Sequence, residues 1–191
     1  MGRSMRLLLL ALLAALVACT RAVSFDGTPL SAVAPNFTLS DQSGRPWSLA
    51  AQHGKSVALY FGYTHCPDDC PLTLAKLSRA IAALGAAGSN AEIAFVTVDP
   101  ARDTPPVLAA YIRRFHGARI VGLTGSRAAL GRIYAAYHVW AQRIPGNERT
   151  GYAVAHASPV FLIDANGRLR VVHDDDDARG AFTHDLRNLN A

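Results

Sequence analysis

Cysteine is scarce in this chain: its 191 residues include three, at Cys19, Cys66 and Cys70. So few cysteines exclude a fold stapled by several disulfides. A bridge between Cys66 and Cys70 would close so short a loop that it would restrain little of the unfolded chain. These two cysteines are therefore better explained by chemistry than by a structural role.

The chain also lacks runs of lysine and arginine interleaved with aromatic residues. The formal net charge is +5, but two of these charges, Arg3 and Arg6, lie in an N-terminal segment without acidic residues. We therefore expect no nucleic-acid partner. Half of the residues are hydrophobic, which suits one domain with a substantial core.

No apolar run near the N-terminus is long enough to cross a bilayer. The run Leu7–Ala18 has twelve residues, too few for a hydrocarbon layer of about 30 Å. Because Arg3 and Arg6 precede it, residues 1–18 are predicted to be an export signal peptide.

The residues Leu16-Val17-Ala18-Cys19 resemble a bacterial lipobox. The resemblance implies that Cys19 is lipidated and becomes the mature N-terminus, which would hold the protein on a membrane. Residues 19–34, rich in small side chains, would form a tether, and residues 35–191 the folded domain. An ordinary signal peptide or short anchor with an incidental cysteine is the alternative.

Strand and helix patterns alternate along the rest of the chain. The expected strands are 36–39, 47–49, 56–62, 92–98, 120–123, 139–144, 152–155, 160–163 and 169–172. The expected helices follow Cys70, with Pro71 at the first position, and cover 105–115, 127–137 and 179–189. This order predicts an α/β sandwich of thioredoxin type, with a central mixed sheet flanked by helices, an N-terminal hairpin and a β-hairpin insertion.

Cys66 and Cys70 lie where the apolar strand 56–62 gives way to a helix. A helix N-terminus carries partial positive charge and free N–H groups, so thiols there lose protons more readily. Thiolates bind soft metals and attack disulfides, so the pattern predicts a metal or redox centre. The CxxxC spacing is one residue longer than that of an ordinary dithiol oxidoreductase.

Three separated segments, 62–71, 98–105 and 155–158, resemble the motif blocks of the Sco/SenC family. These are thioredoxin-fold copper-delivery proteins that help to assemble cytochrome c oxidase, and the resemblance covers residues 25–189. It implies a copper site, with one ion per chain, made by Cys66, Cys70 and His156. Two thiolates and one imidazole favour copper or zinc, and three ligands suit Cu(I), whereas structural zinc usually takes four.

The same resemblance implies partners and a location. Copper would come from a periplasmic copper carrier and pass to the oxidase subunit that carries the CuA centre. The chain would be a periplasm-facing lipoprotein of a bacterial cell membrane and, as a metallochaperone, not an enzyme. Thr20 after Cys19 is typical of outer-membrane sorting in enterobacteria, whereas the family works at the inner membrane, so the membrane stays open.

The chain departs from the family beside the histidine, where Ala155 replaces the usual aspartate and Ala157 follows. A carboxylate there would orient the imidazole, so its absence affects the expected copper affinity or the stability of the Cu(II) form. His65, next to Cys66, is a candidate competitor for metal. Five further histidines are expected at the surface: His53, His116, His138, His173 and His184.

Two acidic segments are predicted to be structural. The block 99–104 is expected to supply a strand end, an ion pair and a helix cap, with Asp103 and Thr104 as capping residues. The run 174–177 is expected to be a solvated turn.

Two other functions use the same residues. A thiol–disulfide oxidoreductase, acting on copper-ligand cysteines of the partner or as a redox sensor, would use Cys66 and Cys70 alone. Against it, Ser158 stands where thioredoxins place a cis-proline, and His156 has no role. A peroxidase of the peroxiredoxin type would not need all three residues.

Overall fold

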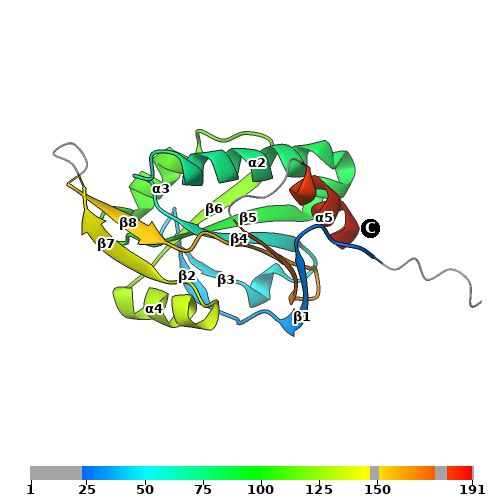
Figure 1. The fold of residues 1–191 in the computed structure, drawn as a ribbon, viewed down its shortest axis with the longest axis horizontal. Helices are drawn as coiled ribbons and strands as arrows, with labels where there is room; N and C mark the ends of the chain where they lie inside the picture. Colours follow the sequence, from blue (N-terminus) through cyan, green and yellow to red (C-terminus); the bar gives the residue numbers. More distant parts are fainter. Residues whose placement is uncertain (1–22, 147–150, 175–179, 191) are drawn as a thin grey trace, which may run out of the picture.

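The computed structural model describes residues 23–146, 151–174 and 180–190. An eight-stranded mixed sheet forms the centre of the molecule, in the order β1-β10-β9-β4-β5-β6-β2-β3 (Figure 1). Its strands are β1 (Thr28–Val33), β2 (Thr38–Asp41), β3 (Pro46–Ser48), β4 (Ser56–Gly62), β5 (Ala91–Thr97), β6 (Arg119–Thr124), β9 (Val160–Ile163) and β10 (Arg168–His173). Strands β4, β5 and β6 run parallel, and the other pairings are antiparallel.

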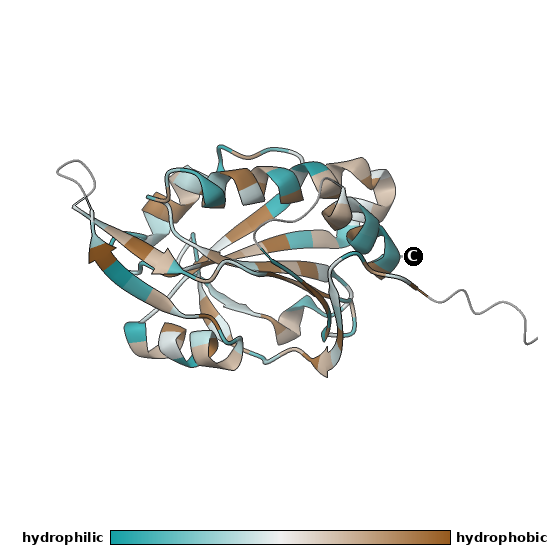
Figure 2. Ribbon diagram, viewed as in Figure 1, coloured by the Kyte–Doolittle hydropathy of each residue, from teal (hydrophilic) through white to brown (hydrophobic). Residues whose placement is uncertain are grey.

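Helices cover both faces of this sheet. They are α2 (Asp69–Ala83), α3 (Pro105–Ile112), α4 (Arg127–Ala136) and α5 (Ala181–Leu189), with short 3-10 turns at Ala50–Gln52 and Gly85–Asn90. Figure 1 shows α2, α3 and α5 on one face and α4 on the other. Every residue of β4 and β5 is buried as a result, and hydrophobic residues gather on these central strands (Figure 2). The predicted sandwich with flanking helices is confirmed.

Both expected hairpins are also present. Strands β2 and β3 pair through a turn at Gly44, whose φ of 78° favours glycine. Strands β7 (Ala141–Pro145) and β8 (Tyr152–His156) form a separate two-stranded sheet that projects beyond the main one (Figure 1). Residues 147–150, which include part of the predicted turn, lie outside the described residues.

The predicted tether is wrong for residues 28–33, which form the edge strand β1. This strand pairs antiparallel with β10. Its start is fixed because the backbone amides of Asp26 and Gly27 donate to the carboxylate of Asp185, at 2.8 and 3.0 Å. Asp185 is fully buried in α5, so the folded part begins well before residue 35.

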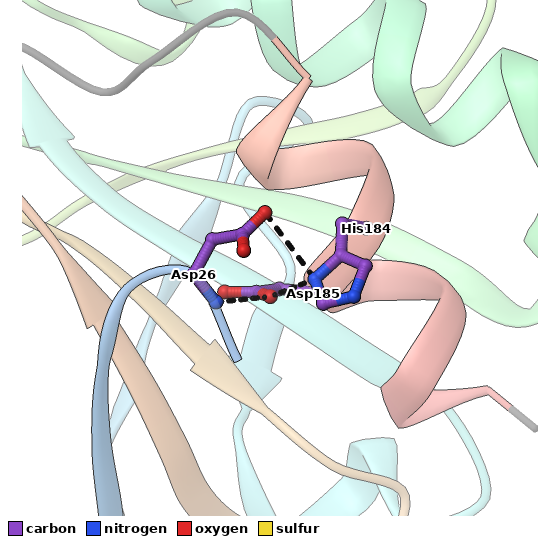
Figure 3. A group of neighbouring side chains, drawn as sticks. All are labelled: Asp26, His184 and Asp185. Atoms are coloured by element: carbon purple, nitrogen blue, oxygen red, sulfur yellow. Dashed lines mark hydrogen bonds and ion pairs between the residues drawn. The ribbon is translucent and has the colours of Figure 1, made fainter. Parts of the chain in front are cut away.

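Asp185 is the centre of a group of polar side chains, three of which are drawn in Figure 3. Besides the two amides, it accepts hydrogen bonds from His184 Nδ1 at 2.9 Å and pairs with His173 Nε2 at 2.9 Å. His173 is 2% exposed, so its predicted surface position is wrong: a buried carboxylate gives its ring a polar partner inside the fold. His53, His116 and His138 are exposed as predicted, whereas His184 is half-buried.

The start of α2 and the capping of α3 differ from the predictions. Helix α2 begins at Asp69, so Cys70 and Pro71 both lie in its first turn, where a missing N–H costs no intrahelical bond. Thr104 precedes α3 at the expected capping position, but its side chain makes no capping hydrogen bond. Ser126 does cap α4, with Oγ accepting from the amide of Ala129 at 3.2 Å.

Among residues 23–146, 151–174 and 180–190, we found no helix both long and apolar enough to span a bilayer. The predicted signal peptide and Cys19 lie outside these ranges, as do Asp175–Asp177 of the predicted acidic turn.

Candidate metal centre

The connection from β4 to α2 places both cysteines at one edge of the sheet. Cys66 lies in the loop and is half-buried, whereas Cys70 lies in the first turn of α2 and is fully buried. Gly62, the last residue of β4, makes room for the second thiol. A Cβ atom at Gly62 would lie 2.8 Å from Cys70 Sγ and 2.8 Å from Phe95, which is closer than side-chain atoms pack.

The two thiols share their protons unequally. Cys66 Sγ accepts a hydrogen bond from the Cys70 thiol and from the helix amides of Cys70 (3.4 Å) and Asp68. The thiol hydrogen bond is the largest cause that lowers the pKa of Cys66, to about 6, although burial acts against it. The same contact, followed by burial, raises the pKa of Cys70. Cys66 is therefore the thiolate near neutral pH, and Cys70 keeps its proton.

His156, the last residue of β8, brings an imidazole to the buried thiol. Its Nε2 lies 3.9 Å from Cys70 Sγ, and its Nδ1 lies 3.0 Å from the carbonyl oxygen of Ala157 and 3.3 Å from Ser158 Oγ. Because a carbonyl oxygen only accepts, Nδ1 carries the proton in the neutral ring. Nε2 therefore presents its lone pair on the side of the cysteines.

In this chain a backbone carbonyl and a hydroxyl orient the His156 imidazole, the role expected of the aspartate that the family usually has at position 155. The Ala157 carbonyl and the Ser158 hydroxyl hold Nδ1, and the Tyr63 ring packs edge-on against the imidazole, with centroids 5.7 Å apart. Tyr63 is 4% exposed. The loss of a carboxylate at Ala155 thus leaves the ring oriented, through a partner that carries no charge.

Asp103 of the block 99–104 holds the cysteine loop through hydrogen bonds to Thr64. Asp103 is fully buried and accepts hydrogen bonds from Thr64 Oγ1 (2.6 Å), the Thr64 amide (3.1 Å) and Thr97 Oγ1 (2.6 Å). Burial raises the pKa of Asp103, although these hydrogen bonds act against the rise. Its predicted structural role is right, but it ties two loops together instead of capping α3.

His65, the candidate competitor for metal, contacts Thr64 and lies near Asp103. Its Nδ1 lies 3.0 Å from Thr64 Oγ1 and 3.9 Å from Asp103 Oδ1.

The structure places His156 Nε2 3.9 Å from Cys70 Sγ, and Cys66 Sγ 3.4 Å from the Cys70 amide. A thiolate, a second sulfur and an imidazole lone pair fit a soft cation such as Cu(I) and do not suit Mg²⁺ or Ca²⁺, which prefer oxygen. The trio is more open than the Asp26, His184 and Asp185 group, whose ligand atoms all lie within 4.8 Å of one another. Metal binding would require the sulfur atoms of Cys66 and Cys70 and the His156 Nε2 atom to move closer together.

The Asp26, His184 and Asp185 group has a sufficient explanation without metal (Figure 3). Each oxygen of Asp185 already has two partners: Asp26 N and His184 Nδ1 on Oδ1, and Gly27 N and His173 Nε2 on Oδ2. A cation would have to displace these contacts. We interpret the group as the anchor that holds the N-terminal strand to α5.

Tyr152 and its contacts with two arginines were not singled out from the sequence; of these arginines, Arg102 belongs to the predicted structural block 99–104. Tyr152 stands four residues before His156 on β8, and its ring lies between the guanidinium groups of Arg102 and Arg143. Residues i and i+4 of a strand share a face, so the aromatic residue in the predicted strand was an available signal. The partners on β7 and in the 99–104 block could not be assigned without the fold.

A thioredoxin-like sandwich with two cysteines at the start of a helix and a histidine from an inserted hairpin defines the class of this protein. Comparison with known families gives the particular one: residues 26–191 match SCO1/SenC. The chain belongs to the SCO1/SenC family.

Relatives and solved structures agree. The chain is 38% identical over 134 residues to the mitochondrial SCO2 homolog of Bos taurus, covering 69% of this chain and 50% of that protein. It is 35% identical over 144 residues to a putative copper-binding protein of Stutzerimonas stutzeri, covering 74% and 69%. The chain thus spans half of the bovine relative and about two thirds of the bacterial one.

The structure of Bradyrhizobium japonicum ScoI with copper bound superposes with a TM-score of 0.73 at 30% identity, covering 83% of this chain and 99% of the other. The apo Sco1 protein of Thermus thermophilus gives a TM-score of 0.77 at 33% identity, covering 88% and 99%.

Proposed function

We propose that this protein binds one copper ion through Cys66, Cys70 and His156 and delivers it to the CuA centre of cytochrome c oxidase. The observation that carries the proposal is the His156 Nε2 lone pair, 3.9 Å from a buried thiol that lies beside a thiolate. The copper bound in the similar Bradyrhizobium japonicum ScoI structure supports it.

Copper uptake changes the protonation of one thiol. The pKa of Cys66 is lowered to about 6, so this thiol is largely ionised near neutral pH, whereas the raised pKa of Cys70 keeps its proton on the sulfur. Cu(I) binding therefore forms two Cu–S bonds and one Cu–N bond and releases the Cys70 proton to solvent. Delivery is the reverse exchange: ligands of the acceptor replace these three donors one at a time.

The proposal extends to the cell envelope. A lipid on Cys19 would hold the protein on a bacterial membrane with the copper site facing the periplasm, where a copper carrier supplies the ion. Lipidation is tested by mass spectrometry of the membrane-isolated protein: an unmodified Cys19, or a mature chain that starts elsewhere, contradicts this part of the proposal.

Anaerobic Cu(I) titration of the reduced protein tests the binding site. We expect one equivalent of Cu(I) to bind, Cys66→Ser and Cys70→Ser to abolish binding, and His156→Ala to weaken it. His53→Ala, at an exposed histidine, is the matched control and leaves affinity unchanged. Unchanged copper affinity in His156→Ala would remove the imidazole from the site.

Thiol–disulfide exchange is the second candidate, and the unequal thiols favour it. Cys66 is a half-buried thiolate suited to attack a disulfide, and Cys70 is a buried thiol suited to release the mixed disulfide. His156→Ala separates the two functions, because it should weaken copper binding while leaving disulfide reduction in place. A protein that reduces disulfides but binds no Cu(I) has the second function alone.

A further inference from the structure

The hairpin that carries His156 is not part of the main sheet. Strands β7 and β8 pair with each other and, in the described part of the chain, with no other strand. Main-sheet hydrogen bonds therefore do not act on His156 directly. Its distance from Cys70 is set by the short link 157–159 that leads into β9 and by the side chains that fasten the hairpin to the body of the protein.

Four of the side chains that make this attachment form one group, which we call the Tyr152 clamp: Tyr152, Asp99, Arg102 and Arg143. The Tyr152 hydroxyl donates to both carboxylate oxygens of Asp99, at 2.8 and 2.9 Å. Its ring lies between the guanidinium carbons of Arg102 and Arg143, at 3.7 and 4.2 Å from the centroid. Its carbonyl oxygen accepts a hydrogen bond from Arg102 Nη1 at 3.0 Å.

The charged groups of the clamp hold one another in place. Asp99 is almost fully buried and forms an ion pair with Arg102, whose side chain is 17% exposed, and a longer one with Arg143 at 3.7 Å. Asp99 and Arg102 both follow β5, on the body of the protein, whereas Arg143 lies on β7. Tyr152 is therefore inserted between an arginine of the body and an arginine of its own hairpin.

Tyr63 connects the clamp to the imidazole. Its ring lies 5.8 Å from the guanidinium carbon of Arg102 and 5.7 Å from the His156 ring. Its hydroxyl oxygen accepts from the amide of Val154, at 3.4 Å, midway between Tyr152 and His156 on β8. A shift of Tyr152 would therefore reach His156 through the strand and through this ring.

We propose that Tyr152 is a positioning residue for the proposed copper site: the clamp holds His156 against Cys70, so that loosening the clamp speeds the release of copper. The inference rests on the proposed copper-binding function. The histidine is then the ligand whose position depends on the clamp, whereas Cys70 is held in the first turn of α2 and the Cys66 loop is held by Asp103.

The test measures how fast Cu(I) leaves the reduced, copper-loaded full chain for an excess of a competing chelator. Tyr152→Phe removes the hydroxyl bonds to Asp99 and keeps the ring, so we expect copper to leave roughly three- to tenfold faster. Tyr152→Leu also removes the stacked ring and should approach the rate of His156→Ala. Tyr137→Phe is the matched control, because it removes a hydroxyl bonded to the Pro35 carbonyl at 2.8 Å and should leave the rate unchanged.

A double-mutant cycle distinguishes positioning from general destabilisation. In a His156→Ala background, Tyr152→Leu should add no further acceleration, since the ligand that it positions is gone. Equal acceleration in both backgrounds, or release at the wild-type rate from Tyr152→Leu, overturns the proposal.

NMR of the copper-free protein gives a readout independent of copper. The nuclear Overhauser contact between the Tyr63 and His156 rings should disappear in Tyr152→Leu and persist in Tyr137→Phe. Its persistence in Tyr152→Leu contradicts the clamp, even if wild type binds no copper and the proposed function itself has failed. Should Tyr152→Leu fail to fold, the same measurements on Tyr152→Phe decide.

Discussion

A single proton distinguishes the two sulfurs of this site. The Cys70 thiol donates to Cys66, and the amides at the start of α2 stabilise the resulting thiolate. One sulfur is therefore ready to bind a cation or attack a disulfide, while the other stays protonated inside the fold. Both side chains are chemically identical, so the difference between their pKa values comes from their surroundings, four residues apart in the chain.

Alkylation kinetics of the apo protein should report this asymmetry. The pKa of Cys66 is lowered to about 6, so its reaction with iodoacetamide should reach half its maximal rate near pH 6, well below an ordinary cysteine. Cys70→Ala removes the largest cause of the lowering and should move the midpoint to higher pH. A midpoint unaffected by Cys70→Ala would show that the helix amides alone stabilise the thiolate.

Gly62 leaves the space that the buried Cys70 sulfur occupies. Gly62→Ala would bring a methyl group within 2.8 Å of Cys70 Sγ and of Phe95, both inside the core. We expect unfolding free energy to fall by about 1–3 kcal/mol, as for other overpacked cores, together with weaker Cu(I) binding. Urea unfolding and Cu(I) titration measure the two effects.

Gly131→Ala is the matched control for that substitution. Gly131 lies inside α4, and no neighbouring atom lies within 4 Å of the place that an added Cβ would occupy, so alanine should stabilise by up to about 1 kcal/mol. If both alanine variants behave alike, close packing around Gly62 is not what matters.

At the scale of elements, the site is where three connections meet: β4 to α2, β5 to α3, and the β7–β8 hairpin. The parallel register Gly62↔Thr97 places the first two at the same edge of the sheet. Asp103 ties them together, since it accepts from Thr64 on one connection and Thr97 at the end of β5. The cysteine loop is thus held by a buried carboxylate instead of by regular secondary structure.

Removing that carboxylate should loosen the cysteine loop. Asp103→Ala leaves three donors without their acceptor, and each buried unsatisfied group costs about 1–3 kcal/mol. We expect a loss of at least about 3 kcal/mol in urea unfolding and faster amide exchange at Thr64. Asp69→Ala, at an exposed carboxylate in the first turn of α2, is the control with a much smaller effect. Equal losses in both would mean that Asp103 does not support the loop.

The sequence predicted those elements that follow from local patterns. Continuous apolar runs predicted β4 and β5, the turn at Asp164–Gly167 predicted the hairpin of β9 and β10, and Ser126 marked the start of α4. The edge strand β1 was missed because all six of its residues are exposed and show no alternation.

Around the site, the motif residues could be predicted but their partners could not. Cys66, Cys70 and His156 stand in recognisable segments, and His156 Nε2 lies 3.9 Å from Cys70 Sγ. Ala157 and Ser158, the two residues after His156, orient the imidazole through the local backbone conformation. Arg143 stacks on Tyr152 once the hairpin has formed. The contacts of Tyr152 with Asp99 and Arg102 join residues far apart in the chain, and no local pattern encodes them.

At the scale of the whole molecule, the two ends of the sheet have separate tasks. The cysteines and the hairpin lie at one end, whereas β1 enters beside α5 at the other (Figure 1). The membrane tether proposed above, attached before β1, would leave the end with the proposed copper site free to approach a partner. The Asp185 anchor and the copper site share no residue, so stability and copper binding should be separable.

Asp185→Ala tests this separation. It removes the carboxylate that accepts from the Asp26 and Gly27 amides and pairs with the buried His173, so we expect unfolding free energy to fall by about 3 kcal/mol or more. Asp26→Ala removes an exposed ion pair with His184 and should cost less than about 1 kcal/mol. Both variants should still bind one Cu(I) per folded chain with wild-type affinity below their unfolding temperatures. A folded Asp185→Ala protein with altered copper affinity would show that the two ends are coupled through the sheet, because no side chain of the anchor reaches the cysteines.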